Sequence, residues 1–145
     1  MNILFVCTGN TCRSPMAAAI ALKAMRAQPG PEHASVASAG RAAEVGAPAS
    51  QQAISVCQEH GLSLGGHRSQ PLTTTLVAAS NRIYTMSRVD AQLLAHIVPD
   101  AAEKIASLAE HDISDPYGGD IRRYEACFNE LEAAIRARLP EWKGE

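Results

Sequence analysis

The chain of 145 residues is 46% apolar and 19% charged, and its net charge at pH 7 is −2. This length and composition fit one compact domain over residues 1–145, with an aliphatic core because only 4% of residues are aromatic. The near-neutral charge argues against binding to nucleic acid or to a membrane surface, and no apolar run approaches the roughly 20 residues of a membrane-spanning helix.

The N-terminal segment is predicted to be a buried strand. Residues 2–6 form a short apolar run that ends at Cys7, without the basic region or cleavage site of a signal peptide. We therefore expect a cytoplasmic protein whose four cysteines are reduced. The cysteines at positions 7, 12, 57 and 127 do not have the spacing of a zinc site, so we expect no metal. Cys57 and Cys127 fall within helical patterns, which indicates packing residues.

A turn and a helix start follow this strand. Gly9 and Asn10 both tolerate positive φ, which allows the chain to reverse sharply there. Ser14 followed by Pro15 is typical of an N-cap and a first helical position, so a helix is predicted over 16–27. The Pro-Gly-Pro run that follows is expected to end this helix.

Strand and helix signals alternate along the rest of the chain. The patterns predict strands over 33–39, 81–86 and 104–108, a short helix or turn over 72–79, and helices over 50–60, 89–97 and 121–135. This alternation indicates an α/β fold with a parallel sheet. In such sheets ligands bind at the carboxyl ends of strands, near a switch in strand order, and Cys7 lies at such an end.

The loop from Cys7 to Ser14 has the features of a phosphate-binding loop. A loop that wraps back on itself points successive backbone N–H groups inward, and the helix behind it adds its positive end. Together they favour a nucleophilic thiolate at Cys7, and Arg13 can hold two phosphate oxygens. The Cys–Arg spacing alone is weak evidence, and Cys7 taken alone could be an unreactive core cysteine, so the strand–turn–helix context decides.

At this point the sequence resembles the low-molecular-weight protein-tyrosine phosphatase family. The similarity covers residues 6–16 and continues at Ser38-Ala39-Gly40, His67-Arg68-Ser69 and Asp115-Pro116-Tyr117. The resemblance implies a single domain with a four-stranded parallel sheet flanked by helices, of flavodoxin-like type, and no metal or organic cofactor. It also implies that the partners are phosphorylated proteins and that inorganic phosphate is product and inhibitor.

The same resemblance implies three catalytic residues. Cys7 would attack phosphorus, Arg13 would hold the phosphoryl group, and Asp115 would protonate the leaving group. Asp115 would then activate the water that hydrolyses the cysteinyl phosphate. Taken alone, the Asp-Pro-Tyr-Gly-Gly segment is better interpreted as a turn, so the acid role depends on its pairing with the Cys7 loop.

Further site residues follow from the resemblance. The predicted substrate-binding residues are Thr8, Gly9, Asn10, Thr11, Cys12, Ser14 and Tyr117. A supporting hydrogen-bonded network behind the loop is expected from Asn10, Ser14, Ser38 and His67, although His67 could also be an ordinary surface histidine. Cys12 either forms a reversible disulfide with Cys7 or simply lines the loop.

The substrate stays open between two phosphorylated side chains. Thr11 stands where tyrosine-specific relatives mostly carry a bulky aliphatic residue, and threonine is typical of the protein-arginine phosphatases of the family. Residues 115–121 also resemble that branch, although the branch tends to have phenylalanine where Tyr117 stands. A small polar wall suits a guanidinium, which an ionised Asp115 can pair with. We favour phosphoarginine by a small margin, with phosphotyrosine as the alternative.

Two other functions fit the sequence less well. Arsenate reductases share this fold and loop but need further cysteines downstream, and residues 72–100 contain none. A non-catalytic phosphopeptide-binding module is expected to lack the nucleophile or the acid, and both Cys7 and Asp115 are present.

Overall fold

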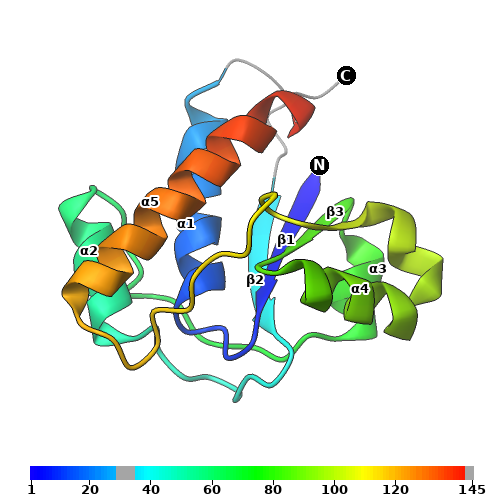
Figure 1. The fold of residues 1–145 in the computed structure, drawn as a ribbon, viewed down its shortest axis with the longest axis horizontal. Helices are drawn as coiled ribbons and strands as arrows, with labels where there is room; N and C mark the ends of the chain where they lie inside the picture. The colour runs from blue at the N-terminus through cyan, green and yellow to red at the C-terminus, as the bar shows by residue number, and fades with distance from the viewer. Residues whose placement is uncertain (29–34, 143–145) are drawn as a thin grey trace.

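A parallel sheet with helices on both faces forms the centre of the computed structural model, which describes residues 1–28 and 35–142 (Figure 1). Its strands are β1 (Asn2–Cys7), β2 (Ser35–Gly40), β3 (Arg82–Thr85) and β4 (Ile105–Ser107). The spatial order is β2-β1-β3-β4, and every neighbouring pair runs parallel. The predicted fold class is confirmed.

The helices lie in the connections between the strands and after the last strand. They are α1 (Arg13–Arg26), α2 (Gln51–Glu59), α3 (Thr74–Ala79), α4 (Arg88–Ile97) and α5 (Ile121–Arg138), with short 3₁₀ helices η1 (Pro99–Lys104) and η2 (Leu139–Trp142). The 3₁₀ helices were not predicted because such short turns carry no hydrophobic period. Within the described ranges, no helix combines the length and the apolar character that crossing a membrane requires.

The start of α1 differs from the prediction. The helix begins at Arg13, and its N-cap is Cys12, which makes no side-chain capping hydrogen bond. Ser14 is therefore not the cap, because its hydroxyl lies against Cys7 and Asn10 instead. In an isolated helix the Ser14 hydroxyl would accept a hydrogen bond from the first turn, whereas here it contacts the loop. The Pro-Gly-Pro run and the first two positions of the predicted 33–39 strand lie outside the described residues.

Strand β1 is buried on both faces, as expected for the centre of a parallel sheet. Ile3 and Phe5 pack in the core shared with α1, α2 and α5, whereas Leu4 and Val6 pack in the core beneath α3 and α4. Each such side chain is at most 1% exposed, and full burial of one stabilises the fold by roughly 1.5–3 kcal/mol. Two separate cores therefore hold β1 and the loop behind it in place.

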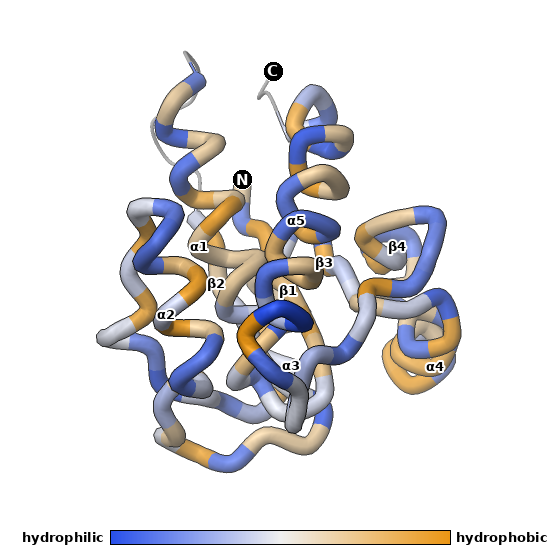
Figure 2. The backbone as a smooth tube through the Cα atoms, turned by 60° about the vertical axis from the view of Figure 1, so that its left-hand side comes forward, coloured by the Kyte–Doolittle hydropathy of each residue, from blue (hydrophilic) through white to orange (hydrophobic). Residues whose placement is uncertain are grey.

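Helix α4 forms where predicted but presents a different face to the core. Leu94 is buried at 3% exposure, whereas Val89, Leu93 and Ile97 are 68%, 42% and 62% exposed. Figure 2 shows the resulting hydrophobic turns of α4 at the edge of the molecule. The apolar spacing identified the helix, but it did not identify which apolar row would face inward.

The strand order places β1 at a topological switch point. The chain goes from β1 to β2 on one side, and then crosses to β3 on the other side of β1. Connections that leave the sheet in opposite directions open a crevice at the carboxyl ends of the strands. Cys7 is the last residue of β1 and lies at that edge.

Candidate active site

The loop between β1 and α1 curls around the sulfur of Cys7. Asn10 has φ of 58° and is the one non-glycine residue with positive φ in the described part of the chain, whereas Gly9 does not adopt positive φ. The reversal therefore depends on Asn10, whose short polar side chain tolerates this conformation. The turn brings the Asn10 N–H to 3.3 Å from Cys7 Sγ.

Cys7 lies at the bottom of this loop and is only 3% exposed. The Ser14 hydroxyl is 2.9 Å from its sulfur, and the backbone N–H of Asn10 is 3.3 Å from the same atom. The N-terminal end of α1, with its free N–H groups, begins six residues further along the chain, at Arg13. These groups can donate hydrogen bonds to a thiolate or to an anion bound above it.

The Asn10 side chain ties the loop to its surroundings. Its amide N–H groups donate to Ser14 Oγ at 2.8 Å and to Ser38 Oγ at 2.9 Å, and its Oδ1 accepts from the backbone N–H of Gln70 at 2.9 Å. His67 Nε2 lies 2.7 Å from the Asn10 carbonyl oxygen, and His67 is half-buried rather than a free surface side chain. The four residues expected to form a network are therefore in contact.

The end of β2 packs directly against the back of the loop. The Arg41 N–H donates to the Cys7 carbonyl and the Ala42 N–H to the Thr8 carbonyl, both at 2.9 Å. A Cβ atom on Gly40 would lie 2.6 Å from the Thr8 carbonyl oxygen and 3.0 Å from the Asn10 nitrogen. Only glycine leaves room for this backbone-to-backbone approach.

A cavity of about 370 Å³ opens above Cys7. Of the predicted site residues, it is lined by Cys7, Thr8, Gly9, Thr11, Cys12, Arg13, Asp115 and Tyr117. Asn10 and Ser14 do not line it, because both are fully buried behind the loop. Four further residues line the cavity that the sequence did not predict, namely Ala42, Glu44, Ala47 and Ser69. Ser69 belongs to a noted motif, but the 42–47 loop carries no sequence signal.

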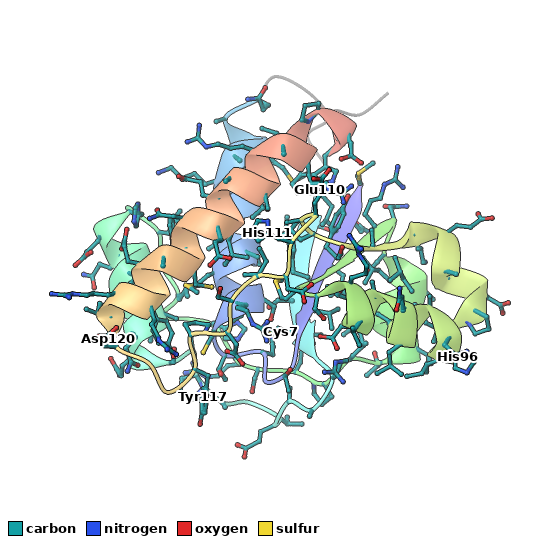
Figure 3. The ribbon with its side chains drawn as sticks, in the orientation of Figure 1. Cys7, His96, Glu110, His111, Tyr117 and Asp120 are labelled. Atoms are coloured by element: carbon teal, nitrogen blue, oxygen red, sulfur yellow. The ribbon has the colours of Figure 1, made fainter. Side chains whose placement is uncertain are left out.

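The loop between β4 and α5 brings Asp115 to this cavity. Figure 3 shows Tyr117 on this loop, near the end of β1 where Cys7 lies. The Ile113 N–H donates to the Met86 carbonyl at 2.8 Å, so the loop is attached beyond the end of β3. Asp115 and Tyr117 are exposed at the cavity mouth, and the Tyr117 N–H donates to Asp115 Oδ1 at 3.1 Å.

Arg13 links the loop from Cys7 to Ser14 to the loop that carries Asp115. Its Nη1 donates to the Ile113 carbonyl at 3.2 Å, and its Nη2 lies 3.6 Å from Asp115 Oδ2. Arg13 is 9% exposed, so its guanidinium is held between the two loops rather than in solvent. The cation, the thiol and the carboxylate therefore border the same cavity.

The three other cysteines are buried thiols. The Cys12 sulfur lies 3.3 Å from Tyr124 Oη and 3.5 Å from Ser50 Oγ. All four cysteines are free, so no disulfide joins Cys12 to Cys7 in this structure. Burial raises the pKa of Cys57 and of Cys127 to about 12, which keeps both thiols neutral, as packing residues should be. No metal-binding group of three or more His, Cys, Asp or Glu side chains occurs among the described residues.

Comparison with known proteins identifies the family. A family model for low molecular weight phosphotyrosine protein phosphatases matches residues 2–144. The chain belongs to this family.

Relatives of the phosphatase include enzymes of two kinds. A protein-arginine-phosphatase of Geobacillus stearothermophilus is 40% identical over 140 residues, which cover 92% of this chain and 90% of that relative. A probable low molecular weight protein-tyrosine-phosphatase of Ralstonia nicotianae, EpsP, is 35% identical and covers 96% of this chain and 94% of its own. Both kinds are protein phosphatases, and so is this enzyme.

One similar solved structure contains a phosphorylated active-site residue. It is a cysteine-to-serine mutant of the YwlE arginine phosphatase with a phosphorylated active-site serine. It superimposes with a TM-score of 0.92 at 31% identity and covers 100% of this chain and 97% of its own. A phosphorylated serine in place of the cysteine is consistent with a cysteine-based mechanism.

Proposed function

We propose that this phosphatase hydrolyses phosphoarginine in proteins, with Cys7 as nucleophile, Arg13 as phosphate ligand and Asp115 as general acid. The observation that carries the proposal is the convergence of these three side chains on one cavity of about 370 Å³. The loop directs the Asn10 N–H toward the Cys7 sulfur, and Arg13 supplies the positive charge that a phosphoryl group requires.

In the first step the Cys7 thiolate attacks phosphorus. The S–P bond forms as the P–N bond of phosphoarginine breaks, and Asp115 gives its proton to the leaving nitrogen. Arg13 holds two of the phosphoryl oxygens while charge is redistributed in the transition state. Once ionised, Asp115 pairs with the guanidinium that departs.

In the second step water attacks the cysteinyl phosphate. Asp115 takes a proton from this water, the S–P bond breaks, and inorganic phosphate is released. The sulfur leaves as a thiolate, which the Ser14 hydroxyl at 2.9 Å and the Asn10 N–H at 3.3 Å can stabilise. Inorganic phosphate occupies the same loop and is therefore expected to inhibit the enzyme.

The cavity walls support a cationic substrate. Thr11 contributes a small polar wall, and the carboxylate-bearing residues Glu44 and Asp115 both line the cavity. A planar guanidinium can pair with a carboxylate through two parallel hydrogen bonds, which an aryl ring cannot do. The 40% identity to a protein-arginine-phosphatase supports the same substrate.

Phosphotyrosine is the second candidate. Tyr117 is the one aromatic residue among the described residues that line the cavity, and it is 74% exposed at the mouth. Its ring can stack against the ring of a bound phosphotyrosine.

We also propose that the enzyme works in the cytoplasm, because a catalytic thiol has to stay reduced.

Kinetics on matched peptides test the substrate. The ratio of kcat/KM for phosphoarginine and phosphotyrosine peptides is measured for the wild type, Thr11→Ile, and the exposed control Thr75→Ile on α3. We expect Thr11→Ile to shift this ratio toward phosphotyrosine by about tenfold or more, because a bulky aliphatic wall replaces a polar one. An unchanged ratio would show that Thr11 does not select, and a wild-type preference for phosphotyrosine would refute the substrate.

The mechanism itself has a separate test. Cys7→Ser should abolish cleavage of 4-nitrophenyl phosphate, because the alcohol is a far weaker nucleophile than the thiolate. Full activity in this variant would refute a cysteinyl-phosphate intermediate.

A further inference from the structure

We infer that Glu130 is a positioning residue for the general acid, because its carboxylate holds the residue next to Asp115 against helix α5. The inference rests on the proposed role of Asp115 and assigns a task to a side chain that does not line the cavity. Glu130 lies near the middle of α5, nine residues after the helix begins at Ile121.

Two donors of Ser114 and the ring of His111, all on the loop that carries Asp115, lie within reach of one oxygen of Glu130. The Ser114 backbone N–H lies 3.4 Å from Oε1, and the Ser114 hydroxyl lies 3.5 Å from the same atom. His111 Nε2 also lies 3.5 Å from Glu130 Oε1, and Figure 3 shows His111 on the same loop. Each contact is long, so the tether depends on their convergence on a charged acceptor.

The helix gives Glu130 a fixed position. Cys127 and Leu131, its neighbours on α5, are both fully buried in the core shared with α1 and α2. The Glu130 side chain is only 25% exposed, so solvent screens its charge less than that of a free surface carboxylate. A helix packed against the core is a more precise support than a loop for a side chain that must position another.

The tether acts at the point where the loop needs it. Ile113 is attached by its N–H to Met86 and by its carbonyl to Arg13. Asp115 itself is exposed and forms only a 3.6 Å contact to Arg13 and a turn contact to Tyr117 among the described residues. Ser114 joins the firmly attached residue to the exposed one, so its contact with Glu130 limits how far Asp115 can move.

Loss of the tether should affect proton transfer in particular. When the S–P bond forms and the P–O bond of an aryl phosphate breaks, the leaving oxygen takes the proton of Asp115. A leaving group such as 4-nitrophenolate departs without that proton, whereas phenolate needs it. A displaced acid therefore slows substrates with poor leaving groups far more than substrates with good ones.

The test compares kcat/KM across aryl phosphates, from 4-nitrophenyl to phenyl phosphate. We expect Glu130→Ala to lower the value for phenyl phosphate about tenfold or more and that for 4-nitrophenyl phosphate less than about threefold. Glu130→Gln should stay within about threefold of the wild type on both, because its amide oxygen still accepts from Ser114. Glu132→Ala is the matched control, since Glu132 pairs with Arg136 on α5, away from the loop.

Asp115→Asn separates this inference from the proposed function. If Asp115→Asn depends steeply on the leaving group but Glu130→Ala behaves like the wild type, Glu130 does not position the acid and the mechanism stands. Equal losses on all substrates in Glu130→Ala would likewise overturn the inference, since they would mean a merely structural role. If Asp115→Asn shows no leaving-group dependence, the acid assignment and the inference both fail.

Discussion

Because Gly40 packs closely against the loop from Cys7 to Ser14, we expect that adding one methyl group at position 40 greatly lowers the activity of the enzyme. Gly40 ends β2, and Gly40→Ala would place Cβ 2.6 Å from the Thr8 carbonyl oxygen, 2.8 Å from Ala43 Cβ and 3.0 Å from the Asn10 nitrogen. Two of these three atoms belong to the backbone of the loop that surrounds Cys7, so no flexible side chain can give way. The loop itself has to move.

The size of the effect follows from these distances. Non-bonded heavy atoms prefer separations near 3.5 Å, so the Thr8 carbonyl must withdraw by about 1 Å. Overpacking of this kind typically costs about 1–3 kcal/mol of stability. The Asn10 N–H that would be displaced lies 3.3 Å from Cys7 Sγ, and a misplacement of about 1 Å at reacting groups can lower the rate about 100-fold.

Kinetics and unfolding measured together test this reasoning. Gly40→Ala should lower kcat/KM on 4-nitrophenyl phosphate about 100-fold and the free energy of unfolding in urea by about 1–3 kcal/mol. Gly66→Ala is the matched control, because no atom lies within 4 Å of its added Cβ and its φ is ordinary. A Gly40→Ala enzyme with near wild-type kcat/KM would refute the claim that this contact holds the loop.

Two buried features give further predictions. Burial raises the pKa of Cys57 and Cys127 from an ordinary value of 9.0 to about 12, so only the unfolded chain ionises these thiols between those values. The urea concentration at which half of the protein is unfolded should therefore decrease as the pH is raised from 8 to 11. An unchanged urea concentration would contradict this. Tyr84→Phe removes the hydroxyl that accepts a hydrogen bond from the Trp142 indole N–H at 2.9 Å. The free energy of unfolding should fall by about 1–3 kcal/mol, measured by urea unfolding with the fluorescence of the single tryptophan as the signal. Unaltered stability would show that this hydrogen bond contributes nothing.

Local patterns predicted most elements because each depends on a few neighbouring residues. The apolar run of β1 and the helical spacing within α5 are both present in the structure. The errors arose where distant contacts compete with local preference. Ser14 is a good helix cap by residue type, yet its hydroxyl faces the Cys7 sulfur. In α4 two apolar rows have the same period, and only the rest of the fold decides that Leu94 faces inward.

The sequence by itself determined the loop from Cys7 to Ser14, because the proposed nucleophile, the turn, Arg13 and the helix start lie within eight consecutive residues and one local geometry accommodates them all. Only the tertiary structure decided that Asp115 borders this loop, through the attachment of Ile113 to Met86 and Arg13. It also decided that Gly40 must lack a side chain. Such contacts join segments that are far apart in the chain, and their distances follow from how the sheet and its two cores pack, which no short stretch of residues encodes.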